Sequence, residues 1–482
     1  MKFDYDVIII GSGPAGFSCA MQSTKFDKKV LVVEANSEYL GGTWINRGTV
    51  PSKAFREAAK LIQSFHSQFD DEEERKPYDH FKMEDLLRYK NNILENKNRK
   101  IKSDFIKNEV ETARGWGRII DGNTVEVTDQ LQNKTTYSTE KIFIATGSRP
   151  TDAASFDIDH SNILDYDSIL NLTHIPRRLS IIGSGSITFE YATIFAALGT
   201  RVTILSEAED ILTHLDHEVK EHLQKLMRRR KIQAFKNTKI QDIEANSLRT
   251  CLEVRFRTPE EDRLQVIETE YVLYVGGKKP NIENIGVKEN GIKTNQEGFI
   301  EVNESYQTSL ESVYAGGDVI GYPALASASF IQGRLAACNM FNIPAEHISE
   351  NIPLAVYSIP EISSVGITEN EARQQGTDVT VGRAYFSNLT EANLHQESEG
   401  LLKLVFKTDD LKLLGVHIIG DQASDLIHLG QFVMDSGGDI KYFIERVINY
   451  PSYTEAYRVA AFNGVNRVHQ AGVKYKKILE KS

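Results

Sequence analysis

Two stretches of the chain share one order of apolar runs and glycine-rich turns. The first opens with "YDVIIIGSGPAG", where the apolar run at residues 7–10 predicts a buried strand that ends at a turn. A helical stretch follows, and "KVLVVEA" predicts a second strand that finishes at Glu34. The second stretch, "RRLSIIGSGSITFEYATIFAALGTRVTILSE", repeats this order and finishes at Ser206 and Glu207. Each stretch predicts a strand–helix–strand unit, which is typical of an α/β protein.

The turn of the first unit has the spacing of a dinucleotide-binding loop. Gly11 permits a tight turn, Gly13 lets a pyrophosphate approach the backbone, and Gly16 allows close packing of the helix. Glu34 ends the second strand, where an acid accepts a hydrogen bond from the adenosine ribose. We predict a dinucleotide site here; the alternative is a turn with a purely structural role.

The second unit repeats this loop with one departure. Gly183 and Gly185 match the first two glycines, but Thr188 stands where the third would be. A β-branched side chain there must push the helix away from the strand or find a pocket of its own. We predict a second dinucleotide site; the alternative is a degenerate unit kept for packing. Two such sites indicate a flavin that exchanges electrons with a nicotinamide.

Composition limits the partners. The 482 residues carry a formal charge of -11, which argues against a nucleic-acid or anionic-membrane surface. Cys19, Cys251 and Cys338 show neither disulfide nor metal spacing, so we expect no metal site and a cytoplasmic protein. The short apolar run near the start predicts a strand, with no signal peptide and no membrane span. The charged run at 69–105 is best interpreted as a solvated helical face.

The segment "GGTWINRGTVPSK" decides the chemistry, because Trp44 and Thr49 occupy the two positions of a redox-active C-x-x-x-x-C pair. With "IFIATGSRP", "VYAGGDVIGYPALASASFIQGRLAA" and "GGKKPN", it resembles the pyridine-nucleotide disulfide oxidoreductase family of FAD enzymes over nearly the whole chain. "NYPSYTEAYRVAAFNGVNR" is similar to the transhydrogenase branch of this family. The resemblance implies two Rossmann-like domains and a C-terminal α+β interface domain that forms a homodimer. The implied domains are FAD binding at 1–150 and 281–350, NAD(P) binding at 151–280, and dimerisation at 351–482.

The resemblance also assigns residues to each nucleotide. Those implied to hold FAD are Gly11, Gly13, Pro14, Ala15, Gly16, Glu34, Gly42, Thr43, Lys53, Thr146, Gly147, Gly317, Asp318 and Ala326. Those implied to hold NAD(H), and by extension NADP(H), are Gly183, Gly185, Ser186, Ile187, Glu190, Ser206, Glu207, Gly277 and Lys278.

The dithiol relay is missing at both of its ends. Trp44 and Thr49 cannot form a disulfide, and Tyr450 stands where the family has its thiol base, a histidine, while Glu455 is retained. Hydride transfer between nicotinamide and flavin needs no thiol base. We therefore expect electrons to enter and leave directly at the flavin ring.

The residues that act beside the flavin in the family mechanism are retained. Lys53 resembles the lysine that pairs with a glutamate beside flavin N5, and Glu190 is the matching acid. The pair would balance charge during reduction, although a buried structural ion pair is the alternative. Trp44 either stacks on the flavin or fills the volume that the cysteine left, and we favour filling.

Nucleotide choice is the open point. Recognition of a 2′-phosphate ordinarily uses a basic residue just after the second strand, but this chain has "SEAED" at 206–210. NADH should therefore be preferred over NADPH. This leaves two alternatives to transhydrogenation: an NADH dehydrogenase that reduces a quinone or other small acceptor, and a non-catalytic FAD-binding redox sensor.

Overall fold

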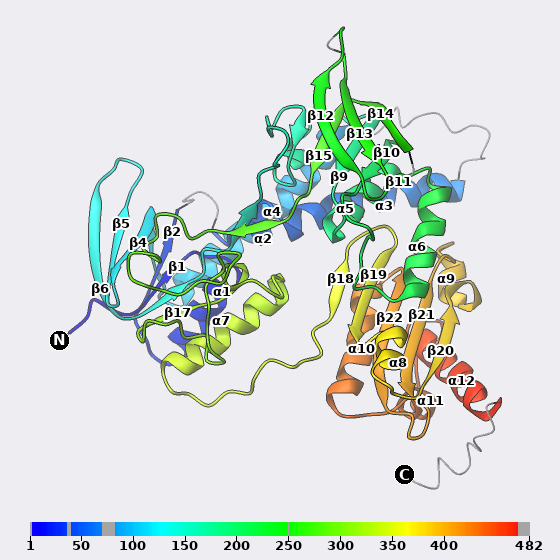
Figure 1. Ribbon diagram of the computed structural model, residues 1–482. Coiled ribbons are helices and arrows are strands. Elements are labelled where there is room, and N and C mark those ends of the chain that lie inside the picture. Colours follow the sequence, from blue (N-terminus) through cyan, green and yellow to red (C-terminus); the bar gives the residue numbers. More distant parts are fainter. Residues whose placement is uncertain (1, 36–39, 70–81, 249, 260, 471–482) are drawn as a thin grey trace.

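The computed structural model describes residues 2–35, 40–69, 82–248, 250–259 and 261–470. Three lobes, each built around its own sheet, make up the molecule (Figure 1). No helix among the described residues is long and apolar enough to cross a membrane.

The first sheet has the order β3-β2-β1-β6-β5-β4, and β17 also pairs with β6. β1 pairs in parallel with β2 and β6, so the glycine loop after β1 lies at the carboxyl edge of a parallel sheet. Helices α1 and α7 pack so closely that a Cβ on Gly333 would lie 2.0 Å from the carbonyl oxygen of Ala15. The bounds are β1 Tyr5–Ile10, α1 Pro14–Thr24, β2 Val30–Glu34, β3 Glu111–Arg114, β4 Trp116–Asp121, β5 Thr124–Thr128, β6 Lys134–Ile144, β17 Val313–Ala315 and α7 Ala326–Met340.

The second sheet has the order β11-β10-β9-β15-β8, and all of its pairings are parallel. A small antiparallel sheet, β12-β13-β14, belongs to the same lobe (Figure 1). The predicted second strand–helix–strand unit is confirmed, with its second strand ending at Leu205. The bounds are β8 Ile163–Leu164, β9 Arg178–Ile182, α5 Ser186–Ala197, β10 Arg201–Leu205, α6 His217–Arg229, β11 Gln233–Phe235, β12 Lys239–Ala245, β13 Leu252–Thr258, β14 Glu261–Thr269 and β15 Tyr271–Tyr274.

The third sheet is antiparallel, with the order β18-β19-β22-β21-β20. Helix α10 packs on β19 and β22, and α12 packs on β20 and β21, which encloses a separate apolar core. The bounds are β18 Leu354–Val356, β19 Glu361–Gly366, α8 Glu369–Gln374, β20 Val379–Tyr385, α9 Thr390–Leu394, β21 Leu401–Lys407, β22 Leu413–Gly420, α10 Ala423–Asp435, α11 Lys441–Glu445 and α12 Glu455–Gln470.

The remaining elements connect the lobes or lie beside them. The charged run is helical at Met83–Lys107, as expected, while its residues 70–81 lie outside the described part of the chain. The other bounds are α2 Thr43–Asn46, α3 Thr49–Phe69, α4 Met83–Lys107, β7 Ser148–Pro150, β16 Lys278–Pro280, and three short 3-10 helices, η2 Ser168–Asn171, η3 Asp318–Ile320 and η4 Phe386–Asn388.

Helix α3 ties the segment that replaces the dithiol to the second lobe. It packs on α5, and the ring centroids of Phe55 and Phe195 lie 6.4 Å apart. The same apolar cluster continues to Ile359 and Leu401 of the third lobe. The position of α3 therefore depends on contacts with both of the other lobes.

A buried ionic cluster joins α6 to the third sheet. Lys403 is only 1% exposed, and its Nζ lies 3.0 Å from Asp216, 2.7 Å from Glu218 and 2.8 Å from Glu369. Arg383 makes two further hydrogen bonds to Glu218, of 2.5 and 2.6 Å. Because Asp216 also caps the start of α6, the cluster fixes that end of the helix.

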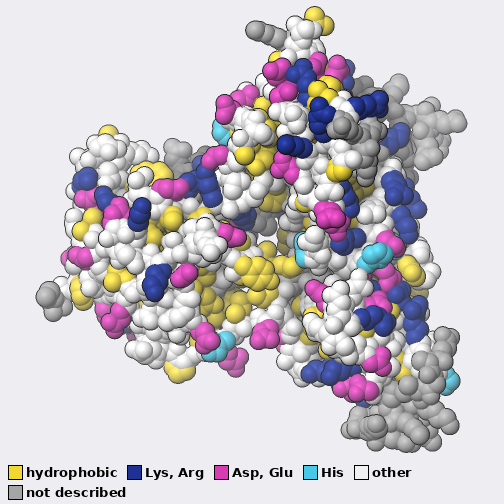
Figure 2. Space-filling view, in the orientation of Figure 1, with side chains coloured by type: hydrophobic (Ala, Val, Ile, Leu, Met, Phe, Trp, Pro, Cys, Tyr) yellow, Lys and Arg dark blue, Asp and Glu magenta, His cyan; other side chains and the backbone are white. Residues whose placement is uncertain are grey.

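The face shown in Figure 2 is hollowed between the lobe of β1 and α7 and the lobe of the third sheet, and hydrophobic side chains gather in the hollow. Contiguous exposed apolar surface of this kind is typical of interaction sites.

Candidate active site

The first glycine loop has the shape that a dinucleotide requires. Gly11 has φ +104°, and a Cβ there would lie 2.4 Å from the carbonyl oxygen of Ala145. A Cβ on Gly16 would lie 1.9 Å from the carbonyl oxygen of Gly11, so α1 packs directly on the turn. In contrast, a Cβ on Gly13 would meet no atom within 4 Å. The start of α1, with Pro14 in its first turn, has no side-chain cap, which leaves its N–H groups open to a phosphate.

Glu34 and the loop after it lie beside this turn. The Oε2 atom of Glu34 accepts hydrogen bonds from the backbone N–H of Ser12 at 3.0 Å and from its hydroxyl at 2.5 Å. The Ser12 hydroxyl oxygen also accepts a bond from the Gly41 N–H at 2.8 Å. A Cβ on Gly42 would lie 2.8 Å from the Cα of Gly13. Glu34, Gly42 and, through the start of α2, Thr43 are therefore gathered at the first loop, as the resemblance implies.

The two later motifs meet the same edge of the first sheet. Asn281 contacts the segment "IFIATGSRP". Its side-chain amide donates to the carbonyl oxygen of Thr146 at 3.0 Å, and its backbone N–H donates to the carbonyl oxygen of Gly147 at 2.9 Å. The hydroxyl of Thr146 is buried without a hydrogen-bond partner. Asp318 follows Gly317, whose N–H donates to Gln332, and Ala326 begins α7. The open Gly13 loop and the unpartnered Thr146 hydroxyl fit a bound FAD.

Lys278 contacts the flavin motif. Its Nζ lies 3.0 Å from the Oδ2 of Asp318, which also accepts a bond from the Ser148 hydroxyl at 2.9 Å. Gly277, with φ +125°, precedes it, and its carbonyl oxygen accepts the N–H of Thr151 at 3.2 Å. The turn expected beside the nicotinamide therefore also borders the expected flavin site.

The second loop accommodates Thr188 by giving its side chain a pocket. Thr188 is completely buried, and a Cβ on Gly183 would lie 2.5 Å from its Oγ1 and 2.7 Å from the carbonyl oxygen of Val275. Within the described part of the chain, that hydroxyl has no hydrogen-bond partner. A Cβ on Gly185 would meet no atom within 4 Å, and α5, which begins with Ser186 and Ile187, has no side-chain cap. This loop is therefore as open to a pyrophosphate as the first.

The end of β10 differs from the end of β2. Ser206 is completely buried, and its hydroxyl is bonded to the backbone N–H and carbonyl oxygen of Ala208, each at 3.2 Å. Glu207 is exposed. Of the two residues implied to face the ribose, only Glu207 has a side chain open to solvent.

Lys53 and Glu190 meet at Tyr357, but they do not form the expected ion pair. The Nζ of Lys53 lies over the ring of Tyr357, 4.6 Å from its centroid. Glu190 accepts the backbone N–H of Tyr357 at 2.9 Å. The physical reason is that Tyr357, which lies between β18 and β19 of the third sheet, offers a cation–π contact to the lysine and a hydrogen bond to the acid.

Glu190 is set up to titrate near neutrality. Burial raises its pKa to about 7, against the opposing effects of the Tyr357 N–H and of the charges of Arg56 and Lys278. A carboxyl group with such a pKa beside a predicted nicotinamide site is a functional-site candidate.

Trp44 is partly buried and packs against the apolar core of the first lobe. Its ring meets that of Phe330, on α7, edge to face at 5.2 Å, and its Nε1 is buried without a partner. The volume-filling interpretation stays a prediction. Thr49 is exposed at the start of α3. Cys19 and Cys338 are buried, and all three cysteines are free.

The two C-terminal candidates lie on the third lobe. The Tyr450 hydroxyl is 2.7 Å from that of Thr390, with Tyr450 65% exposed, and Glu455 pairs with Arg458 at 2.9 Å. Large apolar side chains are exposed on the same lobe, among them Phe432.

Sequence reasoning missed Tyr357 and Asn281. Asn281 ends the motif "GGKKPN" quoted above, whereas Tyr357 begins the segment "YSIPEISSVGITE". Their roles emerge only from contacts across more than 100 positions of the chain.

These sites define a protein with two dinucleotide-binding units, one of which fits FAD. Comparison with known proteins gives the family. The model of the pyridine nucleotide-disulphide oxidoreductase family matches residues 5–333, and that of its dimerisation domain matches residues 352–461. The chain belongs to this family. It is an FAD-dependent pyridine nucleotide oxidoreductase, and its dimerisation domain supports the predicted homodimer.

Individual relatives agree with this placement. The chain is 38% identical to a soluble pyridine nucleotide transhydrogenase of Marinomonas sp. (strain MWYL1), covering 96% of this chain and 99% of the relative. It is 35% identical to a protein of the same name from Pseudomonas aeruginosa (strain LESB58), covering 97% and 99%. The HOCl-induced flavoprotein disulfide reductase RclA of Escherichia coli shares the fold, with a TM-score of 0.85, 23% identity, and coverage of 95% and 99%.

Proposed function

We propose that this protein is a soluble-type transhydrogenase that passes hydride between nicotinamide nucleotides without a dithiol relay. The observation that carries the proposal is the pair Trp44 and Thr49 at the dithiol positions. Trp44 packs against Phe330, and the buried Cys19 and Cys338 are free thiols on helices α1 and α7, outside the segment that replaces the dithiol. The names of the relatives at 35% to 38% identity support the same reaction.

The site residues divide the work. FAD, when bound, supplies a two-electron carrier for hydride. The open loop at Gly13 holds its pyrophosphate, and the loop at Gly185 holds that of the nicotinamide nucleotide. Lys53 contributes positive charge beside Tyr357, and Glu190 contributes a carboxylate once the pH exceeds its pKa of about 7. Tyr357 keeps both groups in place from the third lobe.

The second nucleotide is the inferred hydride acceptor. The acidic run after β10 favours NADH and so leaves an NADH dehydrogenase that reduces a quinone as the alternative. The names of the relatives favour a nucleotide as the acceptor. The three free cysteines agree with a reducing, cytoplasmic compartment.

Anaerobic reduction followed by stepwise reoxidation tests the proposal. We expect one hydride equivalent per FAD, no thiolate-to-flavin charge-transfer band, and reoxidation by an NAD⁺ analogue. Uptake of two equivalents with such a band would show that another cysteine had taken over the relay. Reoxidation by a quinone alone would select the dehydrogenase, and no reduction by either nucleotide would select the redox sensor.

A further inference from the structure

The end of β11 lies directly against the turn that follows β10. The Ser206 N–H donates to the carbonyl oxygen of Phe235 at 2.9 Å, and the Thr238 N–H donates to that of Ser206 at 2.8 Å. A third backbone bond, from Asn237 to Ala208, measures 3.1 Å. Lys236 therefore belongs to the same carboxyl edge of the sheet as the residues expected beside the ribose, although it is remote from them in sequence.

Two lysines already offset the acidic run at this edge. The Nζ atoms of Lys236 and Lys220 lie 2.8 Å from the two oxygens of Asp210. Hydrogen bonds to these lysines hold the pKa of Asp210 well below its usual range, so its carboxylate stays charged and keeps them in place. Only Glu207 and Glu209 of the run remain exposed.

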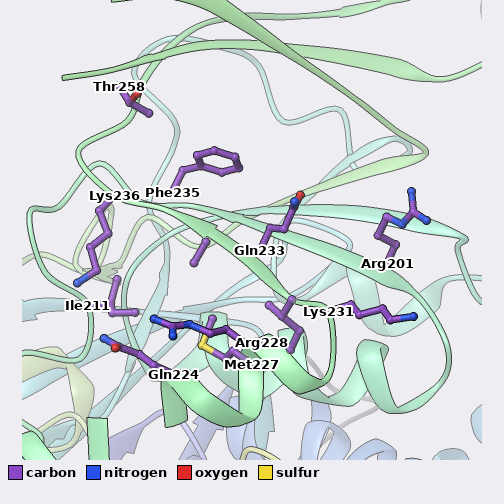
Figure 3. A pocket seen from close by; sticks show the side chains of 12 residues that line it. Arg201, Ile211, Gln224, Met227, Arg228, Lys231, Gln233, Phe235, Lys236 and Thr258 are labelled. Atoms are coloured by element: carbon purple, nitrogen blue, oxygen red, sulfur yellow. The ribbon is translucent and has the colours of Figure 1, made fainter. Parts of the chain in front are cut away.

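A cationic pocket of about 840 Å³ opens beside Lys236. Figure 3 shows that the ends of Lys236, Arg228 and Gln224 lie toward one side of it, near Ile211, while Lys231 lies toward the other. Arg228 is exposed, and among the described residues its guanidinium has no ion-pair partner. On the side of Lys236, the pocket thus offers two cations and an amide, and the Asp210 partner of Lys236 belongs to the acidic run after β10.

We propose that Lys236, together with Arg228, binds the adenosine 2′-phosphate of NADP(H). This inference rests on the proposed function and names the source of the positive charge that the segment after β10 lacks. A phosphate at this place would contact Lys236 and Arg228, with Asp210 as the neighbouring carboxylate that orders Lys236. Lys220, 19% exposed, is more enclosed and is assigned to holding Asp210.

Binding of a phosphate-bearing fragment tests this assignment without any hydride transfer. Calorimetry on the FAD-loaded protein would compare adenosine 2′,5′-bisphosphate with adenosine 5′-monophosphate. We expect the wild type to prefer the bisphosphate, and Lys236→Met to weaken bisphosphate binding by about 10- to 100-fold while leaving the monophosphate unchanged, because one charge-assisted contact is lost.

Two variants control for folding and for nonspecific electrostatic attraction between the phosphate and the lysines of the pocket. Lys236→Arg should keep the preference, since it keeps the charge. Lys231→Met removes a lysine from the other side of the same pocket and should leave both affinities unchanged. Equal affinities in the wild type, an undiminished preference in Lys236→Met, or an equal loss in Lys231→Met would overturn the inference.

Failure of the proposed function is a separate outcome. If the wild type prefers the bisphosphate but an NAD⁺ analogue does not reoxidise the reduced protein, the phosphate site is supported and the proposed transhydrogenase function is contradicted. If the analogue reoxidises the protein but no preference is measured, the reverse holds.

Discussion

At the first glycine loop, a Cβ on Gly16 would lie 1.9 Å from the carbonyl oxygen of Gly11, whereas the second loop carries Thr188 at the corresponding position. The first helix packs on its turn with no room for a side chain. The second unit holds a completely buried threonine against Gly183 and Val275, with its hydroxyl unpartnered. Whether the third position of the motif must be glycine thus depends on how closely the helix packs on the turn. The middle glycines, Gly13 and Gly185, are open in both units, and that openness is what a pyrophosphate needs.

The largest effect should come from Gly16→Val. Its side chain would collide with backbone that cannot move without unfolding the turn, so we expect destabilisation of about 3 kcal/mol or more. Thermal unfolding and the ratio of FAD to purified protein measure this. A stable variant that retains a full complement of FAD would show that α1 can move to make room for the side chain.

A matched pair, Gly13→Val and Gly185→Val, separates the two sites. Neither Cβ meets an atom within 4 Å, so both variants should fold. We expect the first to lose FAD. The second should keep the flavin spectrum, while kcat/KM for reduction by NADH falls by about 100-fold, since the pyrophosphate is displaced. Loss of FAD from both variants would contradict the assignment of one nucleotide to each unit.

Lys53→Met tests the positive charge that α3 contributes. We expect flavin reduction by NADH to slow by about 10- to 100-fold with FAD retained, because the lost charge lies beside Tyr357 and away from the pyrophosphate loop. Rapid-mixing kinetics measure the rate. An unchanged rate would assign Lys53 to structure alone, and loss of FAD would assign it to folding.

Glu190→Gln tests the acid that the second unit contributes. Since the pKa of Glu190 is about 7, its carboxylate gains charge as the pH rises through neutrality and then favours the positive nicotinamide ring that forms when hydride leaves. The rate of flavin reduction should therefore rise through pH 7 in the wild type and be flat in the variant. Stopped-flow rates across this pH range decide the point; an identical step in both proteins would assign the titration to another group.

Thr188→Val should have the smallest effect. Valine has nearly the same shape and removes a buried hydroxyl that has no partner, so we expect stability within about 1 kcal/mol of the wild type, on the stabilising side. Denaturant unfolding measures it. A marked loss would mean that the hydroxyl bonds a group that arrives with the nucleotide.

The sequence predicted the structure correctly where the signal comes from residues close together in the chain. Both units follow from apolar runs and glycine spacing. The predicted end at Glu34 is correct, and the predicted end at Ser206 and Glu207 lies one to two residues beyond Leu205, where β10 ends. The expected ion pair between Lys53 and Glu190 was wrong because Lys53 contacts the ring of Tyr357 and Glu190 its backbone N–H, and these contacts depend on how the third lobe docks. Lys236 was missed for a related reason, since pairing of β11 with β10 brings it to the ribose edge.

The ionic cluster around Lys403 bears on how this chain can be divided. A fragment that ends before the third sheet would leave Asp216 and Glu218 without their cation, while the complementary fragment would keep only Glu369 beside the ammonium group of Lys403. Leaving one member of a buried pair alone typically costs about 3 to 5 kcal/mol, which is a large share of the stability of a single domain. Nucleotide binding by this protein is therefore best studied in the intact polypeptide, and chimeras that exchange the last domain should carry α6 with it.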